Sequence, residues 1–272
     1  MPSNPDTAFI GGEGLEGELR QVANRLAGIL NGCFYDEQAS GLDWPRLLDA
    51  IRLQVDEWAS KNPDNPAHAL ATERLATLTT RPANLLVSIG RLVSQKATLF
   101  LAGEPVSALE RIAEQVSDDG LVIILGSGQP EFEAGILEIA RRCENVLFLH
   151  GYSETLADPL YELGDLFLMP SSFEPCGISQ MLSMRAGVPC VVHGVGGLRD
   201  SVEDGFTGFI FNGDSLNEQA ESFVASVAKA LALRHTRKRL WLAMKQAAAA
   251  KRFEWRDAAK RTIEQLYEAG HR

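Results

Sequence analysis

From residue 84 onward, short continuous apolar runs alternate with amphipathic stretches, and this alternation restricts the possible folds more than any other feature of the chain. The runs "NLLVSIG", "LVIILG", "NVLFLHG", "DLFLMP" and "VPCVVHG" predict strands buried on both faces, and "TGFIF" is a candidate edge strand. Segments such as "EFEAGILEIARRC" and "QMLSMRAG" predict helices, and a helical stretch is expected after the first strand as far as about Val116. We therefore expect residues 84–212 to form a doubly wound, Rossmann-like parallel sheet of the α/β class.

The segment before this sheet is expected to be helical. The stretch "LEGELRQVANRLAGIL" spaces its apolar residues three and four positions apart, which predicts a helix that stops at "NG". "DWPRLLDAIRLQVDEWAS" predicts a second helix, with Asp43 as its N-cap and Pro45 in its first turn. Another helix is expected to follow through Leu78, so residues 1–82 form a helical lead-in.

Helices are also expected after the sheet, in three segments between Leu216 and Ala269. Together with the sheet they make up the second predicted unit, residues 83–272. The expected fold is thus a Rossmann-like domain with extra helices at both ends.

Composition narrows the classes of function. Lys and Arg number 26 against 36 for Asp and Glu, a formal net charge of −10, which disfavours nucleic acid or an anionic membrane as the main partner. The four cysteines are scattered without C-x-x-C pairs or companion histidines, so neither a disulfide framework nor a metal site is expected. "MPSNPDTAF" lacks the features of a secretory signal, and no apolar run approaches the length of a membrane span. We expect a cytoplasmic protein.

Polar loops follow the expected strands, at the edge where doubly wound sheets bind their ligands. After the first strand, "GRLVSQK" places Arg91 and Lys96 where an arginine fork and a lysine charge could hold a pyrophosphate. Two solvated surface cations explain this stretch alone equally well. After the second strand, Gly126 and Gly128 of "GSGQPEFE" would allow a ligand to approach closely, although an ordinary tight turn explains them better. The dinucleotide fingerprint G-x-G-x-x-G is absent, because position 131 is Glu.

"FEPCGISQM" is the most informative loop. A helix that opens near Gly177 would aim the free N–H groups of residues 177–180 at the sheet edge, which favours a phosphate, and the Ser179 hydroxyl adds a donor. Glu174 cannot help to bind that anion, so we expect it to contact a hydroxyl-rich or cationic part of the ligand. A loop or capping carboxylate is the alternative. Cys176 is interpreted as a small buried filler, because no partner histidine is evident.

Taken in order, these loops match a known family. The series "RLVSQK", "GSGQPEFE", "GYSE", "PSSFEPCGISQMLSMRAGVP" and "GVGGLRDSVEDGFTGFIF" closely resembles the C-terminal donor-binding domain of bacterial glycogen and starch synthases. Those enzymes are retaining glycosyltransferases of the GT-B fold. The final "FEWRDAAKRTIEQLYE" resembles the terminal helix of the same family. The resemblance covers most of residues 13–268 and is weakest across residues 35–80.

The resemblance implies roles for individual residues. Arg91 and Lys96 match the pair that holds the distal phosphate and stabilises the leaving nucleotide, and Glu174 matches the essential carboxylate at the donor sugar. These three are the expected catalytic residues. The expected donor-binding residues are Gly177, Ile178 and Ser179, which match the phosphate cradle, Tyr152, which matches an aromatic beside the base, and the turn glycines Gly126 and Gly128. The donor is expected to be ADP-glucose or another nucleotide sugar, with no cofactor and no metal, because the protein supplies the cations.

The chain departs from the family both at this site and in its extent. Ala97 replaces a glycine, Ser172 an arginine, Asp158 a histidine and Val195 a threonine, so affinity or donor choice is expected to differ. The family's N-terminal Rossmann domain, which carries the acceptor surface, is not found in this sequence. A single domain cannot exclude water or position an α-glucan acceptor, so we expect little or no synthase activity from this chain alone.

Two hypotheses of different classes follow. In the first, the chain is the donor domain of an ADP-glucose-dependent α-1,4-glucan synthase, whose partner is a separate N-terminal GT-B domain. In the second, it is a stand-alone module that binds nucleotides or nucleotide sugars without transferase activity. An epimerase is disfavoured by "FEPCG", and a phosphorylase by the lack of a pyridoxal-type lysine signature. An exposed apolar face would favour the first hypothesis, and the sequence does not distinguish ADP from UDP.

Overall fold

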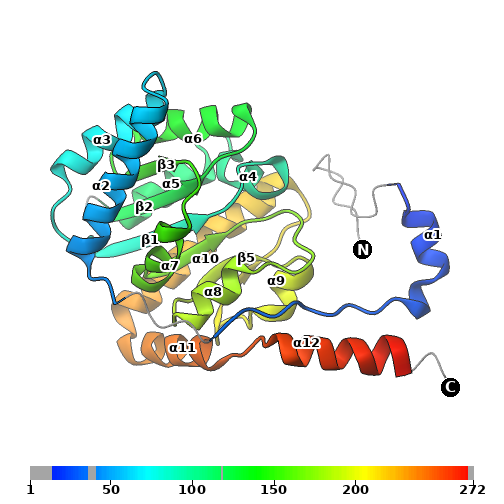
Figure 1. Ribbon diagram of the computed structural model, residues 1–272. Helices are drawn as coiled ribbons and strands as arrows, with labels where there is room; N and C mark the ends of the chain where they lie inside the picture. Colours follow the sequence, from blue (N-terminus) through cyan, green and yellow to red (C-terminus); the bar gives the residue numbers. More distant parts are fainter. Residues whose placement is uncertain (1–13, 36–40, 118, 269–272) are drawn as a thin grey trace.

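Six parallel strands form one sheet in the order β3-β2-β1-β4-β5-β6. The computed structural model describes residues 14–35, 41–117 and 119–268 (Figure 1). The strands are β1 Asn84–Ile89, β2 Gly120–Gly126, β3 Val146–His150, β4 Leu166–Met169, β5 Cys190–His193 and β6 Gly208–Phe211. Each predicted strand is present, and "TGFIF" lies at an edge, as expected. The sheet confirms the doubly wound α/β class.

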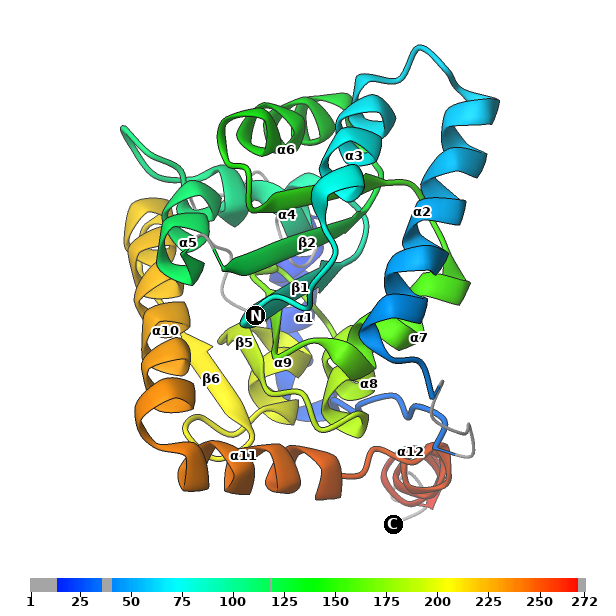
Figure 2. The same ribbon diagram turned by 90° about the vertical axis from the view of Figure 1, so that its left-hand side faces the viewer.

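Helices cover both faces of the sheet (Figure 2). On one face lie α4 Ser94–Leu101, α5 Ala108–Val116, α6 Pro130–Arg142 and α10 Leu216–Thr236. On the other lie α2 Trp44–Lys61, α7 Glu154–Leu163, α8 Ser179–Arg185 and α9 Gly196–Ser201, while α3 Pro66–Thr77 contacts the edge strand β3. The core therefore consists of two apolar clusters, one on each side of the sheet.

Successive residues of β1 show how the sequence produces these two clusters. Leu86 belongs to the cluster that includes α5 and α10, whereas Leu85 and Val87 belong to the cluster that includes α2 and α7. All three are at most 1% exposed. Because both faces of the strand are covered, its sequence is a continuous apolar run rather than an alternating one.

The helix α2 forms as its sequence predicts. The Asp43 side chain accepts a hydrogen bond from the Arg46 N–H at 3.2 Å, and Pro45 lies in the first turn. Leu47 and Ile51 of the apolar stripe are fully buried against the sheet cluster. Residues 44–77, which the sequence groups with the lead-in, thus pack on the same body as the strands. The predicted boundary at residue 82 falls between α3 and β1.

The first predicted helix is shorter than expected. It consists of α1 Glu16–Gln21 and a short 3₁₀ turn, Ala23–Arg25, after which the chain is irregular. Leu15 and Leu26 of the expected stripe are 59% and 55% exposed. An amphipathic segment of this length is only marginally helical in water when its apolar face has nothing to pack against. The first 13 residues of the lead-in lie outside the described residues.

Two helices between strands also differ from expectation. The single helical stretch predicted up to about Val116 is divided into α4 and α5, because Ser107 starts a new helix with a capping box that includes Glu110. The helix α7, between β3 and β4, was not predicted. Pro159 lies inside α7, where it removes one helix hydrogen bond and weakens the helical signal of the sequence.

Three helical segments follow β6, as predicted: α10, α11 Lys238–Ala250, and α12 Trp255–Thr262, which continues as a π-helical turn, Ile263–Glu268. The predicted end of the third segment, Ala269, lies outside the described residues. Among the helices that the structure describes, none combines the length and apolar character needed to cross a membrane.

The elements α1 and α12 project from the sheet body on the same side (Figure 1). The two segments that lead to them lie side by side. The Cys33 N–H donates to the Phe253 carbonyl at 2.7 Å, and the Phe253 N–H donates to the Tyr35 hydroxyl at 2.8 Å. A Cβ at Gly32 would lie 2.3 Å from the Trp255 nitrogen, so only glycine allows the two backbones to approach this closely.

Candidate functional site

The carboxyl ends of β1 and β4 lie next to each other, at the point where the strand order reverses. The chain leaves β1 through Arg91 and enters α4, whose first turn carries Lys96. It leaves β4 through the loop that carries Glu174. Ligands of doubly wound sheets bind at such a reversal point. The fold therefore brings the three residues predicted to be catalytic to the carboxyl ends of the strands, where a ligand is expected.

Lys96 and Glu174 form an ion pair across this point. Lys96 Nζ lies 3.0 Å from Glu174 Oε2, and the two side chains are only 24% and 9% exposed. The Ser171 hydroxyl donates to the same carboxylate oxygen at 3.3 Å. The pair joins the β1 side of the site to the β4 side, and each charge is neutralised by the other.

Arg91 differs from Lys96 in its surroundings. Its side chain is exposed, and it makes no ion pair or side-chain hydrogen bond with any residue of the three described ranges. A guanidinium group that is free to move at the mouth of the site is able to approach a diphosphate with its bidentate fork.

The loop that carries Glu174 is held by α4 and β5. The Gln95 side chain donates to the Phe173 carbonyl at 2.7 Å, and the Ser172 N–H donates to the Gln95 carbonyl at 2.8 Å. His193 Nδ1 donates to the Ser171 carbonyl at 3.1 Å, and burial lowers the pKa of this imidazole. Sequence reasoning missed Gln95, whose position beside Lys96 was the one available signal.

Two glycines let α9 support the same loop. The Gly197 N–H donates to the Glu174 carbonyl at 2.9 Å. A Cβ at Gly196 would lie 2.1 Å from the Glu174 carbonyl oxygen, and one at Gly197 would lie 2.2 Å from the Cys176 oxygen. The backbone of the Glu174 loop thus rests directly on the first turn of α9, in space that any side chain would fill.

The residues predicted to form a phosphate cradle lie at the start of α8. Gly177 has a φ of +73°, and α8 begins at Ser179. None of the N–H groups of residues 177–180 donates to a backbone carbonyl of the described chain. Burial raises the pKa of the Tyr161 phenol to about 12, and the Ser179 side chain opposes this shift. Ile178 is 43% exposed at this edge.

The Gln180 side chain supports the turn at Gly177. It is fully buried, and its amide nitrogen lies within 3.1 Å of the Cys176 carbonyl, the Gly177 carbonyl and the Ser201 hydroxyl. These contacts tie the turn at Gly177 to α9. Sequence reasoning considered only the backbone N–H of Gln180, so it missed this role of the side chain.

Gly126, the last residue of β2, and Gly128, in the loop that follows it, pack against the loop after β1. A Cβ at Gly126 would lie 2.0 Å from the Gly90 oxygen, and one at Gly128 would lie 2.2 Å from the Leu92 oxygen. Gly128 and Leu92 also form an isolated parallel bridge. The glycines therefore bring the β2 loop against the loop that carries Arg91.

Tyr152 lies just beyond the end of β3 and is 76% exposed. Its hydroxyl donates to Glu154 Oε1 at 2.6 Å, which holds the ring at the start of α7. An exposed aromatic face held in this way offers a stacking surface for a base.

The four residues that differ from the family pattern are Ala97, Ser172, Asp158 and Val195. Ala97 is 1% exposed within α4, and Val195 is the N-cap residue of α9. The Ser172 hydroxyl donates to the Gln95 carbonyl at 3.1 Å, and Asp158 lies 3.3 Å from Arg185. Ser172 and Asp158 therefore bind neighbouring protein groups.

Cys176 is expected to react slowly with thiol reagents. Burial raises the pKa of this thiol, with Glu174 adding to the shift, while the Asn31 N–H, 3.2 Å from the sulfur, opposes it. A raised pKa leaves less thiolate at neutral pH. Alkylation rates measured by mass spectrometry at about pH 7.5 should be lower for Cys176 in the folded protein than for a free model thiol. Faster reaction than the model thiol would contradict a filler role.

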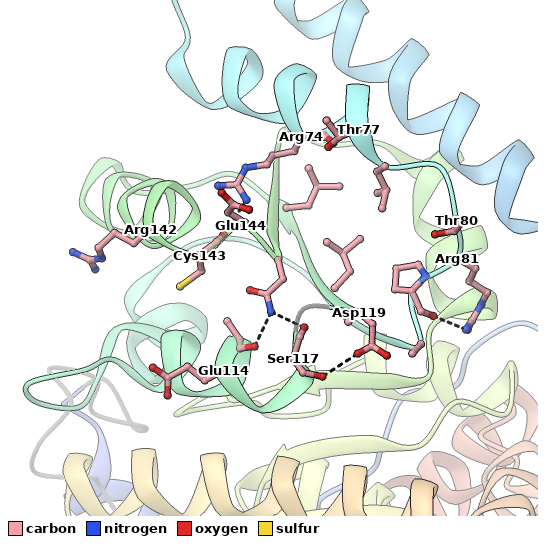
Figure 3. Close-up of a pocket in the computed structure, with 18 residues that line it drawn as sticks. Arg74, Thr77, Thr80, Arg81, Glu114, Ser117, Asp119, Arg142, Cys143 and Glu144 are labelled. Carbon is pink, nitrogen blue, oxygen red and sulfur yellow. Dashed lines mark hydrogen bonds between the residues drawn. The ribbon is translucent and has the colours of Figure 1, made fainter.

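A cavity of about 850 Å³ lies at the amino-terminal ends of the strands, beside the first residues of β1 and β2 (Figure 3). Its cations are already engaged by the protein. Arg74 donates to the Ala140 and Cys143 carbonyls, Arg81 contacts Asp165, and Arg142 pairs with Glu110. A much smaller cavity, of about 20 Å³, lies between β1 and β4 beside Arg91 and Lys96. In the larger cavity these arginines are bound to protein groups and are not available to a ligand. The volume of a cavity therefore does not show where the donor would bind.

Within the described residues, no group of three or more His, Cys, Asp or Glu side chains could hold a metal ion. The positive charge at the edge of β1 and β4 comes from Arg91, Lys96 and the N–H groups that open α8.

The chain is similar to proteins of known activity. Residues 74–247 match the family described as glycosyl transferases group 1. The sequence is 37% identical over 264 residues to glycogen synthase of Anaeromyxobacter sp. strain Fw109-5, covering 94% of this chain and 51% of the relative. It is 33% identical over 255 residues to glycogen synthase of Desulforudis audaxviator, covering 91% and 47%. The chain thus spans about half the length of the curated relatives it matches.

Solved structures show the same architecture. The catalytic domain of starch synthase IV from Arabidopsis thaliana, bound to ADP and acarbose, has a TM-score of 0.70 and 25% identity, covering 96% of this chain and 52% of that one. Anabaena HepE, in complex with UDP and glucose, has a TM-score of 0.57 and 18% identity, covering 88% and 55%. These likenesses confirm the GT-B-like fold.

Proposed function

Because this chain belongs to the glycosyl transferases group 1 family, we propose that it is the donor-binding half of a glycogen synthase-like glucosyltransferase. In the complete enzyme the reaction would move glucose from ADP-glucose to an α-1,4-glucan. The observation that carries the proposal is the Lys96–Glu174 pair at the carboxyl ends of β1 and β4, beside the open N–H groups of α8. This arrangement offers a cationic and a carboxylate partner to one ligand.

The donor diphosphate would lie across these strand ends. Arg91, Lys96 and the backbone N–H groups of residues 177–179 would bind its oxygens and stabilise the negative charge that grows on the departing nucleotide. This division of roles needs no metal ion and no cofactor. It supports cleavage of a bond to phosphate, because the positive groups converge where the leaving group gains charge.

Glu174 would act on the sugar. Its carboxylate is held by Ser171 and its backbone by a contact with Gly197, so it has a fixed position beside Lys96. When the diphosphate engages Lys96, the freed carboxylate oxygen can accept from glucose hydroxyls or face the positive charge that develops at the anomeric carbon. Tyr152 would stack on the base.

The preference for ADP-glucose is supported by one neighbour. The starch synthase IV domain, 25% identical, is described as bound to ADP and acarbose. HepE, described with UDP and glucose, shares the fold only. We therefore propose an adenine nucleotide sugar as the donor.

The acceptor would require a second GT-B domain as partner. The exposed apolar residues of α1 and of the terminal helix fit a docking face for it: Leu15, Leu19, Trp255, Ile263, Leu266 and Tyr267 are all more than a third exposed. Both elements project from the sheet body on the same side (Figure 1). We propose that the half of the curated relatives that this chain does not match would cover them and bring the α-glucan to the donor site.

The protein would act in the cytoplasm, where thiols such as its free cysteines stay reduced.

The proposal is tested by calorimetric titration of this chain with ADP, UDP and ADP-glucose. We expect ADP and ADP-glucose to bind, and UDP to bind at least tenfold more weakly. Equal binding of ADP and UDP would contradict the donor preference. Nucleotide binding together with a polymerising activity that never appears, even with the missing half supplied, would favour a stand-alone binding module. No binding of any of the three would overturn the donor-site assignment.

A further inference from the structure

A second polar cluster lies at the carboxyl end of β3. His150, the last residue of β3, lies between Glu133 of α6 and Asn65, the N-cap of α3. Its Nε2 is 2.9 Å from Glu133 Oε1, and its Nδ1 is 2.7 Å from Asn65 Nδ2. The His68 ring of α3 lies 5.7 Å from the His150 ring, centroid to centroid. We call Asn65, His68, Glu133 and His150 the His150 cluster. None of its members has a role in the donor site described so far.

The hydrogen bonds of the cluster define one tautomer of His150. Asn65 Oδ1 accepts from the Ala67 N–H at 2.9 Å, as the cap of α3, so the Asn65 NH₂ group faces His150. An NH₂ group only donates, so His150 Nδ1 must be the acceptor. The single proton of the neutral imidazole is therefore on Nε2, on the Glu133 side.

The contact between His150 and Glu133 is close but poorly aligned. Nε2 is buried and has no well-directed hydrogen-bond partner among the described residues, although Glu133 Oε1 is only 2.9 Å away. Burial alone would raise the pKa of Glu133, but the Gly128 N–H and His150 outweigh it and hold that pKa below its usual value. Glu133 is thus a carboxylate that attracts the Nε2 proton.

Glu133 links this cluster to the loop that carries Arg91. The same oxygen, Oε1, accepts from the Gly128 N–H at 2.7 Å. Gly128 bridges to Leu92, and the Gln129 N–H donates to the Leu92 carbonyl at 2.7 Å. Leu92 directly follows Arg91. A continuous series of contacts therefore runs from the start of α3, through His150 and Glu133, to the cation at the mouth of the site.

We propose that His150 is a positioning residue of the donor site: its neutral imidazole, held in one tautomer by Asn65, orients Glu133 and thereby the loops that carry Gly128 and Arg91. The inference rests on the proposed function in so far as those loops bind the donor diphosphate. It assigns to α3 and β3 a part in donor affinity although neither element carries a residue of the proposed donor site.

The arrangement makes the loop sensitive to pH. The groups facing the imidazole are the Glu133 carboxylate of α6, the His68 ring and the Asn65 amide of α3. Protonation of Nδ1 would set its new N–H against the Asn65 NH₂ group at 2.7 Å. Either the ring shifts, which moves Glu133, or the Asn65 amide turns and releases the cap of α3. Protonation of His150 should therefore lower donor affinity.

Nuclear magnetic resonance tests the link without any nucleotide. In the wild-type chain the Gly128 amide shift should follow the His150 ring titration with the same midpoint. Asn65→Asp keeps a good N-cap residue but offers a carboxylate acceptor to Nδ1, so the midpoint measured for His150 should rise relative to wild type, and the Gly128 midpoint should rise with it. Glu138→Gln, on the same helix as Glu133, is the control and should move neither. Independent titration of Gly128 and His150 would overturn the proposal.

Calorimetry with ADP at neutral pH tests the consequence for binding. His150→Phe and Glu133→Gln should weaken ADP binding about three- to tenfold, the equivalent of one hydrogen bond, with melting temperatures that show folded protein. Glu138→Gln should bind as wild type. Wild-type affinity in both variants would overturn the positioning role. If the wild-type chain binds no nucleotide, the proposed function fails. The resonance titration still decides whether His150 positions the loops that carry Gly128 and Arg91.

Discussion

Replacing Lys96 by Ala should weaken ADP binding about tenfold to a hundredfold, while replacing Glu174 by Gln should leave it intact or tighten it several-fold. The ion pair explains both results. In the wild-type chain, a diphosphate must compete with Glu174 Oε2, 3.0 Å from Lys96 Nζ, for the same ammonium group. Loss of Lys96 removes a charge-assisted contact of about 1.5–3 kcal/mol. The Glu174→Gln substitution keeps the shape of the side chain but frees Lys96 for the phosphate.

Calorimetric titration of the two variants against the wild type measures this difference. The Glu174→Gln chain should, however, show no glucosyl transfer when the missing half of the enzyme is supplied, because the group that faces the sugar is lost. Glu174→Ala serves as a second variant that removes the carboxylate and its volume together. A loss of ADP binding in the Glu174 variants as severe as in Lys96→Ala would show that the roles are wrongly divided.

The second large effect is expected from a single methyl group at Gly197. Its Cβ would lie 2.2 Å from the Cys176 oxygen and 2.4 Å from the Cys176 Cα, which are backbone atoms that cannot turn aside. Gly197→Ala must therefore push the Glu174 loop away from α9. We expect a loss of about 1–3 kcal/mol of stability, a melting temperature lower by roughly 3–10 °C, and ADP binding weakened more than about tenfold.

Gly28→Ala is the matched control, since nothing lies within 4 Å of a Cβ at that position and its φ is ordinary. It should change neither the melting temperature nor ADP affinity. Thermal unfolding by circular dichroism and calorimetry with ADP decide the matter. An unchanged melting temperature in Gly197→Ala would mean that the loop and α9 are not in contact in solution.

The strands were predictable because burial on both faces requires continuous apolar runs, which stand out in the sequence. The same argument placed Arg91, Lys96 and Glu174 at one edge of the sheet, since the ends of parallel strands converge there. It could not show that Lys96 and Glu174 form an ion pair, because that depends on β1 and β4 being neighbours in the sheet, which no local pattern encodes.

The errors of the sequence interpretation have physical causes as well. The helix α7 was missed because Pro159 interrupts its pattern, yet its apolar face packs on the sheet and keeps it helical. The first helix was predicted too long because its leucine spacing is correct but Leu15 and Leu26 are more than half exposed. In both places, packing rather than local propensity decides the outcome. The His150 cluster was equally out of reach, since it joins α3, β3 and α6 through side chains distant in sequence.

The paired segments at Gly32 and Trp255 have a mechanical consequence. An element joined to a domain by a single peptide segment can rotate about that segment in any direction. Here the two segments that carry α1 and α12 are hydrogen-bonded to each other, from Cys33 to Phe253 and from Phe253 to Tyr35. Two segments joined by hydrogen bonds restrict relative rotation more than a single segment does. A partner that contacts both α1 and α12 would therefore be joined to the sheet body through two connected segments, which limits the orientations it can take.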